Sequence, residues 1–206
     1  LEAFDDYKYT PLRIDKRQAI IECLAILLKN IPDLLKYSIT RYIPANMFVG
    51  VPIEEINIPS NIRKISVGAF ERCDKLEKIN FNEDSVIEIG KNAFYGCERL
   101  KNVYLPKSLK RIDEGVFSNI EVINIPKNVE FIHEKAFKYC NDSLKVIILD
   151  SVKPQVYSCQ FYYLNNLKDI YYVGNETQWE EFIKEKNIKF FPYAKIKIHY
   201  NCTFTF

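Results

Sequence analysis

The strongest constraint on the fold is a unit of about 23 residues that recurs about six times along the 206-residue chain. Each copy contains a phenylalanine with an aliphatic residue five positions before it, and in three copies a cysteine follows three positions after it. The phenylalanines are Phe48, Phe70, Phe94, Phe117, Phe137 and Phe161, and the cysteines are Cys73, Cys97 and Cys140. A unit of this size cannot bury its apolar residues alone. The periodicity therefore predicts a stack of copies in which equivalent residues pack on one another.

A second apolar pattern lies between successive phenylalanines. In one copy it consists of Leu100, Val103 and Leu105, and it ends at Pro106, which cannot donate a backbone hydrogen bond to a neighbouring strand. A shorter apolar pair follows, and the phenylalanine segment then has the spacing of a single helical turn. Together these elements predict an α/β solenoid of about six copies whose strands form a parallel ladder.

The repeated unit resembles the leucine-rich repeat of the BspA type. The resemblance is carried by residues 85–90, 92–97 and 100–106, which read SVIEIG, NAFYGC and LKNVYLP. Residues 167–179 and 195–201 are similar to the segments that close such arrays. The resemblance covers about residues 40–201. It implies a leucine-rich-repeat scaffold of the kind found in cell-surface proteins, and it specifies the fold far better than the ligand.

The ends of a solenoid need segments that cover its terminal apolar faces. An apolar helical pattern predicts that residues 1–38 form a helical N-terminal cap, with the remnant of another domain as the alternative. Residues 39–173 are assigned to the repeats, and residues 174–206 to a C-terminal cap within the same structural domain. We expect this cap to contain a helix that begins with a capping box of Thr177 and Glu180. The helix should bury Trp179, Phe182 and Ile183, and a strand should then alternate from Ile196 to Phe206.

The composition argues against several functions. A net charge of +2 is too small for a typical nucleic-acid-binding protein. Two histidines, His133 and His199, and six glycines leave little material for histidine catalysis, a metal site or a phosphate-binding loop. We therefore predict that the protein is not an enzyme and has no catalytic residue, metal ligand or cofactor. The cysteines form no CxxC pair, and their place in the repeat favours buried thiols over disulfides.

The outward-facing positions of the predicted strands form a candidate partner-binding surface on the concave side of the array. These positions are Lys78, Asn80, Asn102, Tyr104, Val122, Asn124, Val146, Ile148, Asp169 and Tyr171. The column is polar in the early copies and becomes apolar later, and exposed apolar patches with aromatic residues often mark interfaces. The alternatives are that a terminal extension or a second copy of the chain covers these residues, or that they are ordinary strand-forming residues.

The first functional hypothesis is a non-catalytic binding or adhesion module that presents this surface to a protein or glycan, such as a host surface or matrix component. The resemblance places such a module at a cell surface, outside the cell. The alternative is an intracellular protein-interaction or assembly scaffold. The chain begins with Leu1 and shows no signal-peptide pattern, and its longest apolar stretch is too short to span a membrane. We therefore expect a processed or truncated piece of a longer protein, and the sequence leaves its oligomeric state open.

Overall fold

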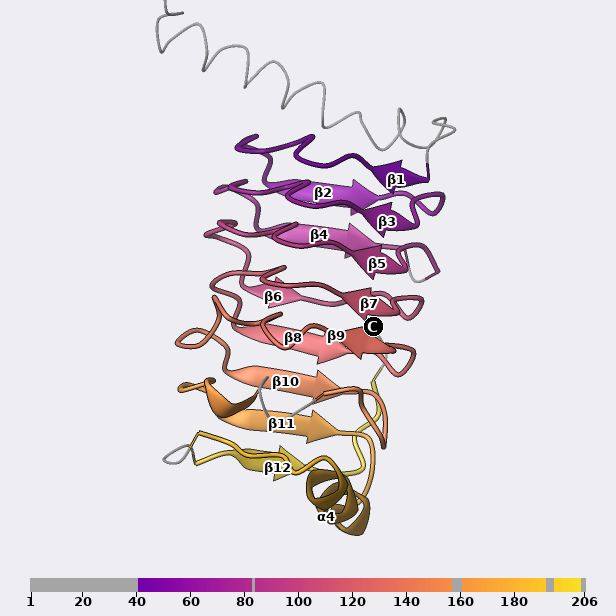
Figure 1. Cartoon of the computed structure of the whole chain (residues 1–206), viewed down its shortest axis with the longest axis vertical. Helices are drawn as coiled ribbons and strands as arrows, with labels where there is room; N and C mark the ends of the chain where they lie inside the picture. The colour runs from indigo at the N-terminus through magenta and orange to yellow at the C-terminus, as the bar shows by residue number, and fades with distance from the viewer. Residues whose placement is uncertain (1–40, 83, 157–160, 192–194, 205–206) are drawn as a thin grey trace, which may run out of the picture.

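A computed structural model describes residues 41–82, 84–156, 161–191 and 195–204 (Figure 1). The predicted N-terminal helical cap, residues 1–38, lies outside the described residues. The first six strands are β1 (Tyr42–Ile43), β2 (Glu55–Ile58), β3 (Lys64–Ile65), β4 (Lys78–Phe81), β5 (Glu88–Ile89) and β6 (Asn102–Val103). The next five strands are β7 (Arg111–Ile112), β8 (Val122–Ile125), β9 (Phe131–Ile132), β10 (Val146–Leu149) and β11 (Asp169–Tyr172). Helix α4 (Glu176–Glu185) and strand β12 (Lys197–His199) follow.

The strands form a parallel β-solenoid, as the repeat predicts. The short strands make one five-stranded sheet in the order β1-β3-β5-β7-β9. The other strands make a five-stranded sheet in the order β12-β11-β10-β8-β6 and a separate pair, β2-β4. All strand pairs are parallel, and each successive turn of the chain adds one rung (Figure 1). The solenoid has about five turns, and the described residues contain little helix.

Register keeps equivalent apolar residues in line through the core. Ile123, Ile147, Ile170 and Ile198 are paired in turn across β8, β10, β11 and β12. In the turn segments, the Phe48, Phe70, Phe94 and Phe117 rings stack on one another with centroids 5.1, 5.2 and 5.6 Å apart. All six predicted phenylalanines are buried, and the first four members of the predicted column form this stack within the core. The area that they remove from water is a main source of stability.

The phenylalanine segments are tight turns that link neighbouring copies. Within one copy, the Cys73 N–H donates to the Phe70 carbonyl three residues before it, at 3.2 Å. Between copies, the Phe70 N–H donates to the Ala93 carbonyl at 2.8 Å. The turn therefore satisfies its backbone groups both locally and across the array, as buried backbone groups must be.

The predicted column of buried thiols is confirmed for Cys73, Cys97 and Cys140. All three are free cysteines without measurable exposure. Each Sγ lies 3.0, 3.3 or 3.5 Å, respectively, from the carbonyl oxygen of Phe48, Phe70 or Phe117 in the preceding copy and donates to it. Loss of hydration raises the pKa of Cys73 and of Cys140 to about 12, because burial disfavours the thiolate.

Helix α4 begins two residues earlier than its predicted capping box. Asn175 is the N-cap, and its Oδ1 accepts the Gln178 N–H at 2.9 Å while Gln178 Oε1 accepts the Asn175 N–H at 2.9 Å. The prediction of Thr177 with Glu180 was wrong because Asn is at least as good an N-cap as Thr, and Gln serves as its reciprocal partner. Trp179 and Phe182 are buried as predicted, and Ile183 is half-buried.

Strand β12 is shorter than the alternating pattern predicted. It ends at His199, and Asn201 has a positive φ of 55°, which an extended strand cannot continue through. The Cys202 N–H then donates to the Tyr172 carbonyl at 3.1 Å. The regular strand pairing thus ends after three residues, although Asn201 and Cys202 still donate hydrogen bonds to the end of β11 and the residues after it. Residues 205–206 lie outside the described part.

Candidate partner-binding surface

The outer face of the five-stranded sheet β12-β11-β10-β8-β6 carries two rows of side chains. Parallel register places Val122, Val146, Asp169 and Lys197 in one row. It places Asn124, Ile148, Tyr171 and His199 in a second row, two residues further along the strands. We call these two rows, apart from the buried Asn124, the outer face. Eight residues from four strands therefore lie in a regular lattice, at the spacing of a β-ladder.

The apolar part of the outer face is half-buried rather than fully exposed. Val122, Val146, Ile148 and Tyr171 all retain partial exposure, although none is among the fully exposed large apolar residues. Neighbours in the same row cover one another's flanks, because directly opposed side chains in adjacent strands are in contact. The result is an apolar strip that spans β8, β10 and β11 and remains partly exposed to solvent.

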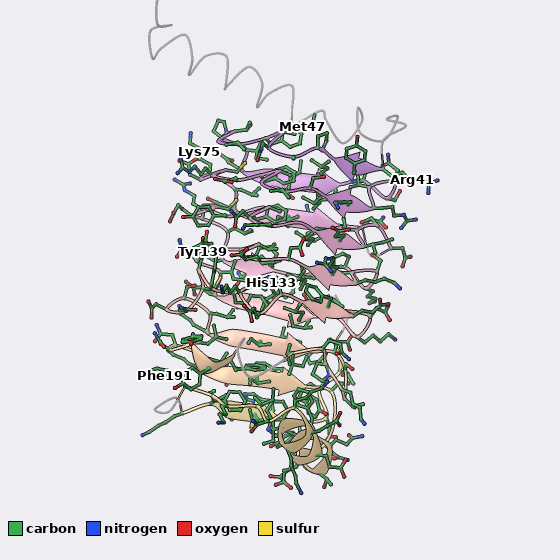
Figure 2. The ribbon with its side chains drawn as sticks, viewed as in Figure 1. Arg41, Met47, Lys75, His133, Tyr139 and Phe191 are labelled. Carbon is green, nitrogen blue, oxygen red and sulfur yellow. The ribbon has the colours of Figure 1, made fainter. Side chains whose placement is uncertain are left out.

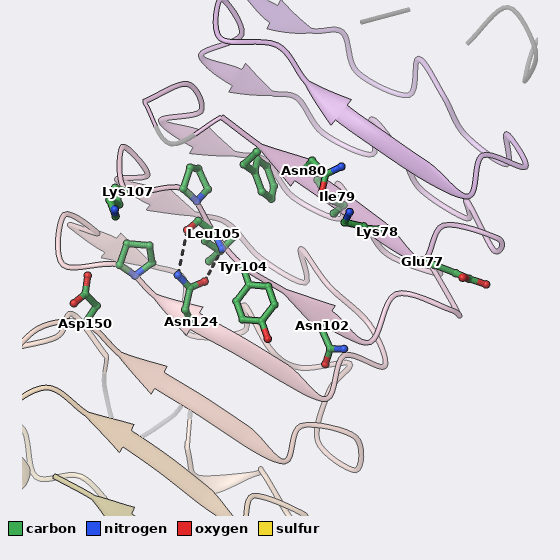
Figure 3. Close-up of a pocket in the computed structure, with 13 residues that line it drawn as sticks. Glu77, Lys78, Ile79, Asn80, Asn102, Tyr104, Leu105, Lys107, Asn124 and Asp150 are labelled. Atoms are coloured by element: carbon green, nitrogen blue, oxygen red, sulfur yellow. Dashed lines mark hydrogen bonds between the residues drawn. The ribbon is translucent and has the colours of Figure 1, made fainter. Parts of the chain in front are cut away.

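Asn124 does not belong to the accessible surface, which corrects the sequence prediction. Its exposure is 2%. Asn124 Oδ1 accepts the Leu105 N–H at 2.5 Å, and Asn124 Nδ2 donates to the Leu105 carbonyl at 3.1 Å (Figure 3). In a continued ladder the Leu105 carbonyl would need a donor from residue 126, but Pro126 has no N–H. The Asn124 amide replaces the missing backbone partner and is therefore turned inward.

Lys78 and Asn80 lie on a different sheet from the rest of the predicted column. Asn80 Nδ2 donates to Asn57 Oδ1 at 2.7 Å and to Glu55 Oε1 at 2.5 Å. Lys78 Nζ lies 3.2 Å from Glu55 Oε1. The hydrogen bond from Asn80 and the positive charge of Lys78 lower the pKa of Glu55. This polar lattice belongs to the β2-β4 pair, so the predicted column consists of two separate parts.

A groove marks the boundary between these two parts. No strand pairing joins β4 to β6 in the described part of the chain, so both strands are edges that face one another. The groove encloses about 540 Å³. Ile79 and Asn80 line it from β4, and Asn102, Tyr104 and Leu105 line it from β6 and the residues that follow (Figure 3). Tyr104 is 47% exposed and Asn102 is also exposed, as the sequence predicted.

His199 has a role on the outer face that sequence reasoning missed. Its Nε2 lies 2.8 Å from Asp169 Oδ1, and its ring stacks on Tyr171 with centroids 4.3 Å apart and planes 5° apart. Alternation from Ile196 predicts that His199 lies on the polar side of the last strand, and it does not identify the residues that the ring contacts. The missing signal was the register of β12 with β11, which pairs His199 with Tyr171. This cluster extends the apolar strip with an aromatic and polar end.

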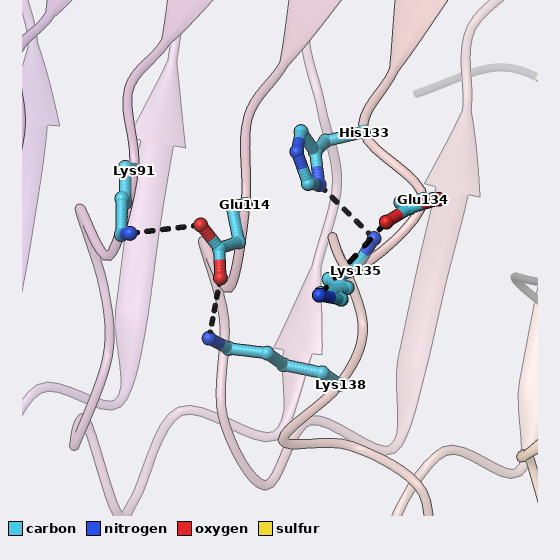
Figure 4. A network of polar contacts seen from close by, with 6 residues as sticks. All are labelled: Lys91, Glu114, His133, Glu134, Lys135 and Lys138. Atoms are coloured by element: carbon cyan, nitrogen blue, oxygen red, sulfur yellow. Dashed lines mark hydrogen bonds and ion pairs between the residues drawn. The ribbon is translucent and has the colours of Figure 1, made fainter.

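The titratable side chains of His133 and Glu114, which lie outside the outer face, make contacts within the fold. His133, which is labelled in Figure 2, accepts the Lys135 N–H at Nδ1 over 3.1 Å, which is a turn contact (Figure 4). Glu114 bridges two copies, with its carboxylate oxygens 2.7 Å from Lys138 Nζ and 2.8 Å from Lys91 Nζ (Figure 4). Across the described ranges, no group of three or more His, Cys, Asp or Glu side chains is placed to hold a metal ion.

Among the described residues, no helix is long enough and apolar enough to cross a bilayer. Helix α4 has ten residues and is largely polar.

A family model named BspA type leucine rich repeat region matches residues 41–168 with six copies. The chain belongs to this family. The BspA-type repeats therefore coincide with the solenoid from β1 to the residues just before β11. Leucine-rich-repeat proteins generally mediate protein interactions and are typically non-catalytic.

Two solved structures share the fold of these BspA-type repeats. The pneumococcal vaccine antigen PcpA is similar with a TM-score of 0.60 and 19% sequence identity, over 80% of this chain and 40% of that chain. The T. pallidum leucine-rich repeat protein TpLRR is similar with a TM-score of 0.57 and 23% identity, over 74% of this chain and 79% of that chain. The chain thus spans less than half of the pneumococcal antigen. No curated protein matches the sequence.

Proposed function

We propose that this chain is a non-catalytic binding module that presents its outer face to a protein or glycan partner at a cell surface. The observation that carries the proposal is the apolar strip of Val122, Val146, Ile148 and Tyr171, held in register across three strands. Interfaces are commonly built on a contiguous apolar patch with aromatic residues and a polar rim. Asp169, Lys197 and His199 supply such a rim at one end of the strip.

The family supports the interaction role, and one structural neighbour supports the location. Leucine-rich-repeat proteins generally mediate protein interactions. PcpA is described as a pneumococcal vaccine antigen, and this description supports the surface location that we propose. Adhesion to a host surface or matrix component is the specific form of binding that we propose for this chain.

The test compares two double variants of the chain against purified extracellular-matrix proteins, mucins and a glycan array. Val146→Asp with Ile148→Asp places two charges in the strip and should lower affinity for the bound component at least a hundredfold. Val49→Asp with Val67→Asp is the matched control, because both valines are exposed elsewhere on the molecule. Equal binding by the strip variant and the wild type, with both folded by circular dichroism, would remove the outer face from the proposal.

The second candidate is an intracellular protein-interaction or assembly scaffold. It is favoured by four free cysteines, Cys73, Cys97, Cys140 and Cys202, among the described residues. Reducing compartments preserve free thiols. Protease treatment of intact cells separates the two candidates. Digestion of the protein on intact cells supports the surface module, and protection until lysis supports the scaffold.

We also propose that residues 174–206 act as the C-terminal cap of the array. The Trp179 ring lies against Tyr172 of β11 with centroids 5.2 Å apart, and β12 pairs with β11. Both elements therefore cover the last turn of the solenoid, which would otherwise leave apolar surface and a strand edge in water.

A further inference from the structure

A second groove crosses the residues that immediately precede β3, β5, β7 and β9. Arg63, Ile87, Lys110 and Glu130 hold these four equivalent positions. The Ile87 N–H donates to the Arg63 carbonyl at 2.7 Å, and the Lys110 N–H donates to the Ile87 carbonyl at 2.9 Å. The Glu130 N–H continues the series to the Lys110 carbonyl at 2.9 Å. The four positions therefore stack along the axis of the solenoid over three rung spacings, about 14 Å (Figure 1).

Residues from neighbouring segments complete the lining of this groove. Ser108 and residues 127–129 come from the connections that lead to β7 and β9, and Lys153 and Gln155 come from the segment after β10. The enclosed volume is about 670 Å³. We call this hollow the basic groove. Its lining shares no residue with the outer face, so it is a separate surface of the molecule.

The charge of the basic groove differs from that of the groove between β4 and β6. Its described lining carries four basic side chains and one acidic side chain, an excess of three positive charges (four minus one), whereas the lining of the other groove has two of each. The basic residues are Arg63, Lys110, Lys127 and Lys153, and the acidic residue is Glu130. Like charges that line one concave surface add their potentials and attract ions of the opposite sign.

Two of these cations have no carboxylate partner in the described part of the chain. Arg63 Nη1 donates to the backbone carbonyls of Asp84 and Ser85, and the second of these bonds measures 3.0 Å. Carbonyl groups are neutral, so they fix the guanidinium without cancelling its charge. The Asp84 side chain does not line the groove. Lys127 is exposed and forms no ion pair with any described residue. Both cations therefore remain available to an anion.

The other two cations are held in exposed ion pairs. Lys110 Nζ lies 2.7 Å from Glu130 Oε1, and Lys153 Nζ lies 3.7 Å from Glu185 Oε2. All four side chains are more than half exposed, and Lys153 reaches 75%. Exposed ion pairs contribute little free energy, because water and salt screen them. An anionic ligand can therefore replace either carboxylate at small cost.

The uncharged polar side chains of the basic groove are suited to hydroxyl groups. Asn128 Nδ2 donates to the Lys107 carbonyl at 2.8 Å, which leaves Asn128 Oδ1 as an acceptor. Ser108 Oγ donates to the Val86 carbonyl at 2.8 Å, which leaves its lone pairs as acceptors. Gln155 adds a further amide. Hydrogen-bonding groups thus alternate with cations along the groove.

The same lining is poorly suited to nucleic acids and to apolar peptide side chains. None of its described residues is aromatic, so it lacks the rings on which single-stranded nucleic acids stack their bases. Its apolar members are Ile87, which is 36% exposed, and Val129, which is buried. Peptide interfaces usually bury a larger apolar or aromatic centre.

We propose that the basic groove binds a sulfated polysaccharide that lies across the rungs, along the axis of the solenoid. Its sulfate groups contact the four cations of the lining, and its hydroxyl groups bond to Ser108, Asn128 and Gln155. A chain with alternating sulfate and hydroxyl groups matches the alternation of cations and amides on the protein. The proposal goes beyond the function of the outer face and does not rest on it.

The test titrates the full chain with dextran sulfate and with uncharged dextran of the same length, by isothermal calorimetry. Dextran sulfate should bind, more tightly in about 50 mM than in about 200 mM salt, because binding releases counterions. Dextran should not bind. Equal binding of the two polymers, or an affinity for dextran sulfate that is independent of salt, would overturn the proposal.

Matched lysine variants place the polymer on the molecule. Lys127→Ala with Lys153→Ala should weaken dextran sulfate binding at least tenfold. Lys75→Ala with Lys168→Ala removes the same charge from two exposed lysines outside the groove lining and should change the affinity less than twofold (Figure 2 labels Lys75). Equal losses in the two double variants, with both folded by circular dichroism, would show that net charge alone attracts the polymer.

An acidic variant should act in the opposite direction. Glu130→Gln removes the negative charge from the lining and releases Lys110, so it should tighten dextran sulfate binding at least threefold. Glu77→Gln is the control, because it breaks a comparable exposed pair with Arg99 outside the basic groove. An unchanged or weaker affinity of Glu130→Gln would contradict the proposal.

Two other anionic polymers test the class of ligand. Polyglutamate and single-stranded oligothymidylate should bind at least tenfold more weakly than dextran sulfate at equal charge concentration. Tighter binding of either polymer would replace the polysaccharide by an acidic peptide or a nucleic acid. A matrix component held by the basic groove alone should be insensitive to Val146→Asp with Ile148→Asp, so failure of one surface is distinguishable from failure of the other.

Discussion

Asn124 shows how one side chain can depart from a repeat that otherwise fixes its direction. Alternation along β8 assigns Asn124 to the outside, yet its exposure is 2%. The cause is Pro126, which leaves the Leu105 carbonyl without a backbone donor in a continued ladder. Proline ends this strand pattern in the sequence, but the pattern alone does not reveal which neighbour must supply the missing hydrogen bond.

Asn124→Ala should lower the free energy of unfolding by about 1–3 kcal/mol for each Leu105 backbone group that it leaves buried and unsatisfied. Urea unfolding followed by circular dichroism measures the change. Asn102→Ala is the control, because Asn102 is exposed, and its effect should stay within about 0.5 kcal/mol. Two equally small effects would mean that the Asn124 amide does not replace the ladder.

The buried cysteines give a second prediction that concerns individual side chains. Cys73, Cys97 and Cys140 should resist iodoacetamide at pH 8 in the native state, because they are buried and remain thiols far above neutral pH. Mass spectrometry should find all three alkylated only after denaturation in urea. Rapid native alkylation of any one of them would show that the column is open to solvent.

At the scale of elements, the sequence predicts which side chains are buried better than which strands are paired. Ile79, Val103 and Ile123 are all buried at equivalent positions, as the repeat requires. The repeat pattern gave no indication that β4 and β6 are unpaired. The one irregularity near the break is copy length, because Val103 follows Ile79 by 24 positions and Ile123 follows Val103 by 20. Alternation fixes the face of a residue, whereas pairing also depends on the connections.

For α4 and β12, the sequence likewise predicts the buried residues better than the residues at which the elements begin and end. The apolar spacing of Trp179 and Phe182 predicts a helix that buries them, and both are buried in α4. Its first residue depends on a local choice between Asn175 and Thr177, which have similar capping strength. The positive φ of Asn201 likewise ends the alternating segment early, although the apolar pattern itself continues.

Trp179→Ala should destabilise the chain by about 3–5 kcal/mol, because it removes a large buried ring that packs on Tyr172 of the last complete rung. Urea unfolding should show the loss, together with earlier exchange of the β11 amides. Glu181→Ala changes an exposed residue of the same helix and should have little effect. A similarly small effect of Trp179→Ala would contradict the proposal that α4 caps the array.

At the scale of the whole molecule, polar bridges between copies add to the apolar columns. Glu114 contacts Lys91 from the copy before it and Lys138 from the copy after it. Hydrogen bonds from Lys138 and Lys91 lower the pKa of Glu114 from 4.5 to about 2. A carboxyl whose pKa is lower in the folded state stabilises the fold above its unfolded pKa. This stabilisation is lost as the pH falls towards the folded pKa.

The contribution of Glu114 to the temperature of unfolding should therefore depend on pH in the acid range. At pH 7, Glu114→Gln should unfold at a lower temperature than the wild type. The difference should shrink as the pH falls from about 5 to 2 and vanish below about pH 2, where the wild-type carboxyl also becomes protonated. Circular dichroism melts at five pH values measure this. A difference that stays constant down to pH 2 would show that Glu114 does not stabilise the fold through its charge.

The outer face is the proposed binding surface of the solenoid. Hydroxyl-radical footprinting with mass spectrometry can be carried out on the free chain and on its complex with the matrix or mucosal component that it binds. We predict reduced oxidation of Val146, Ile148 and Tyr171 in the complex, with Val67 and Tyr163 unchanged. Protection of Val67 or Tyr163, with no change at Val146, Ile148 and Tyr171, would contradict the claim.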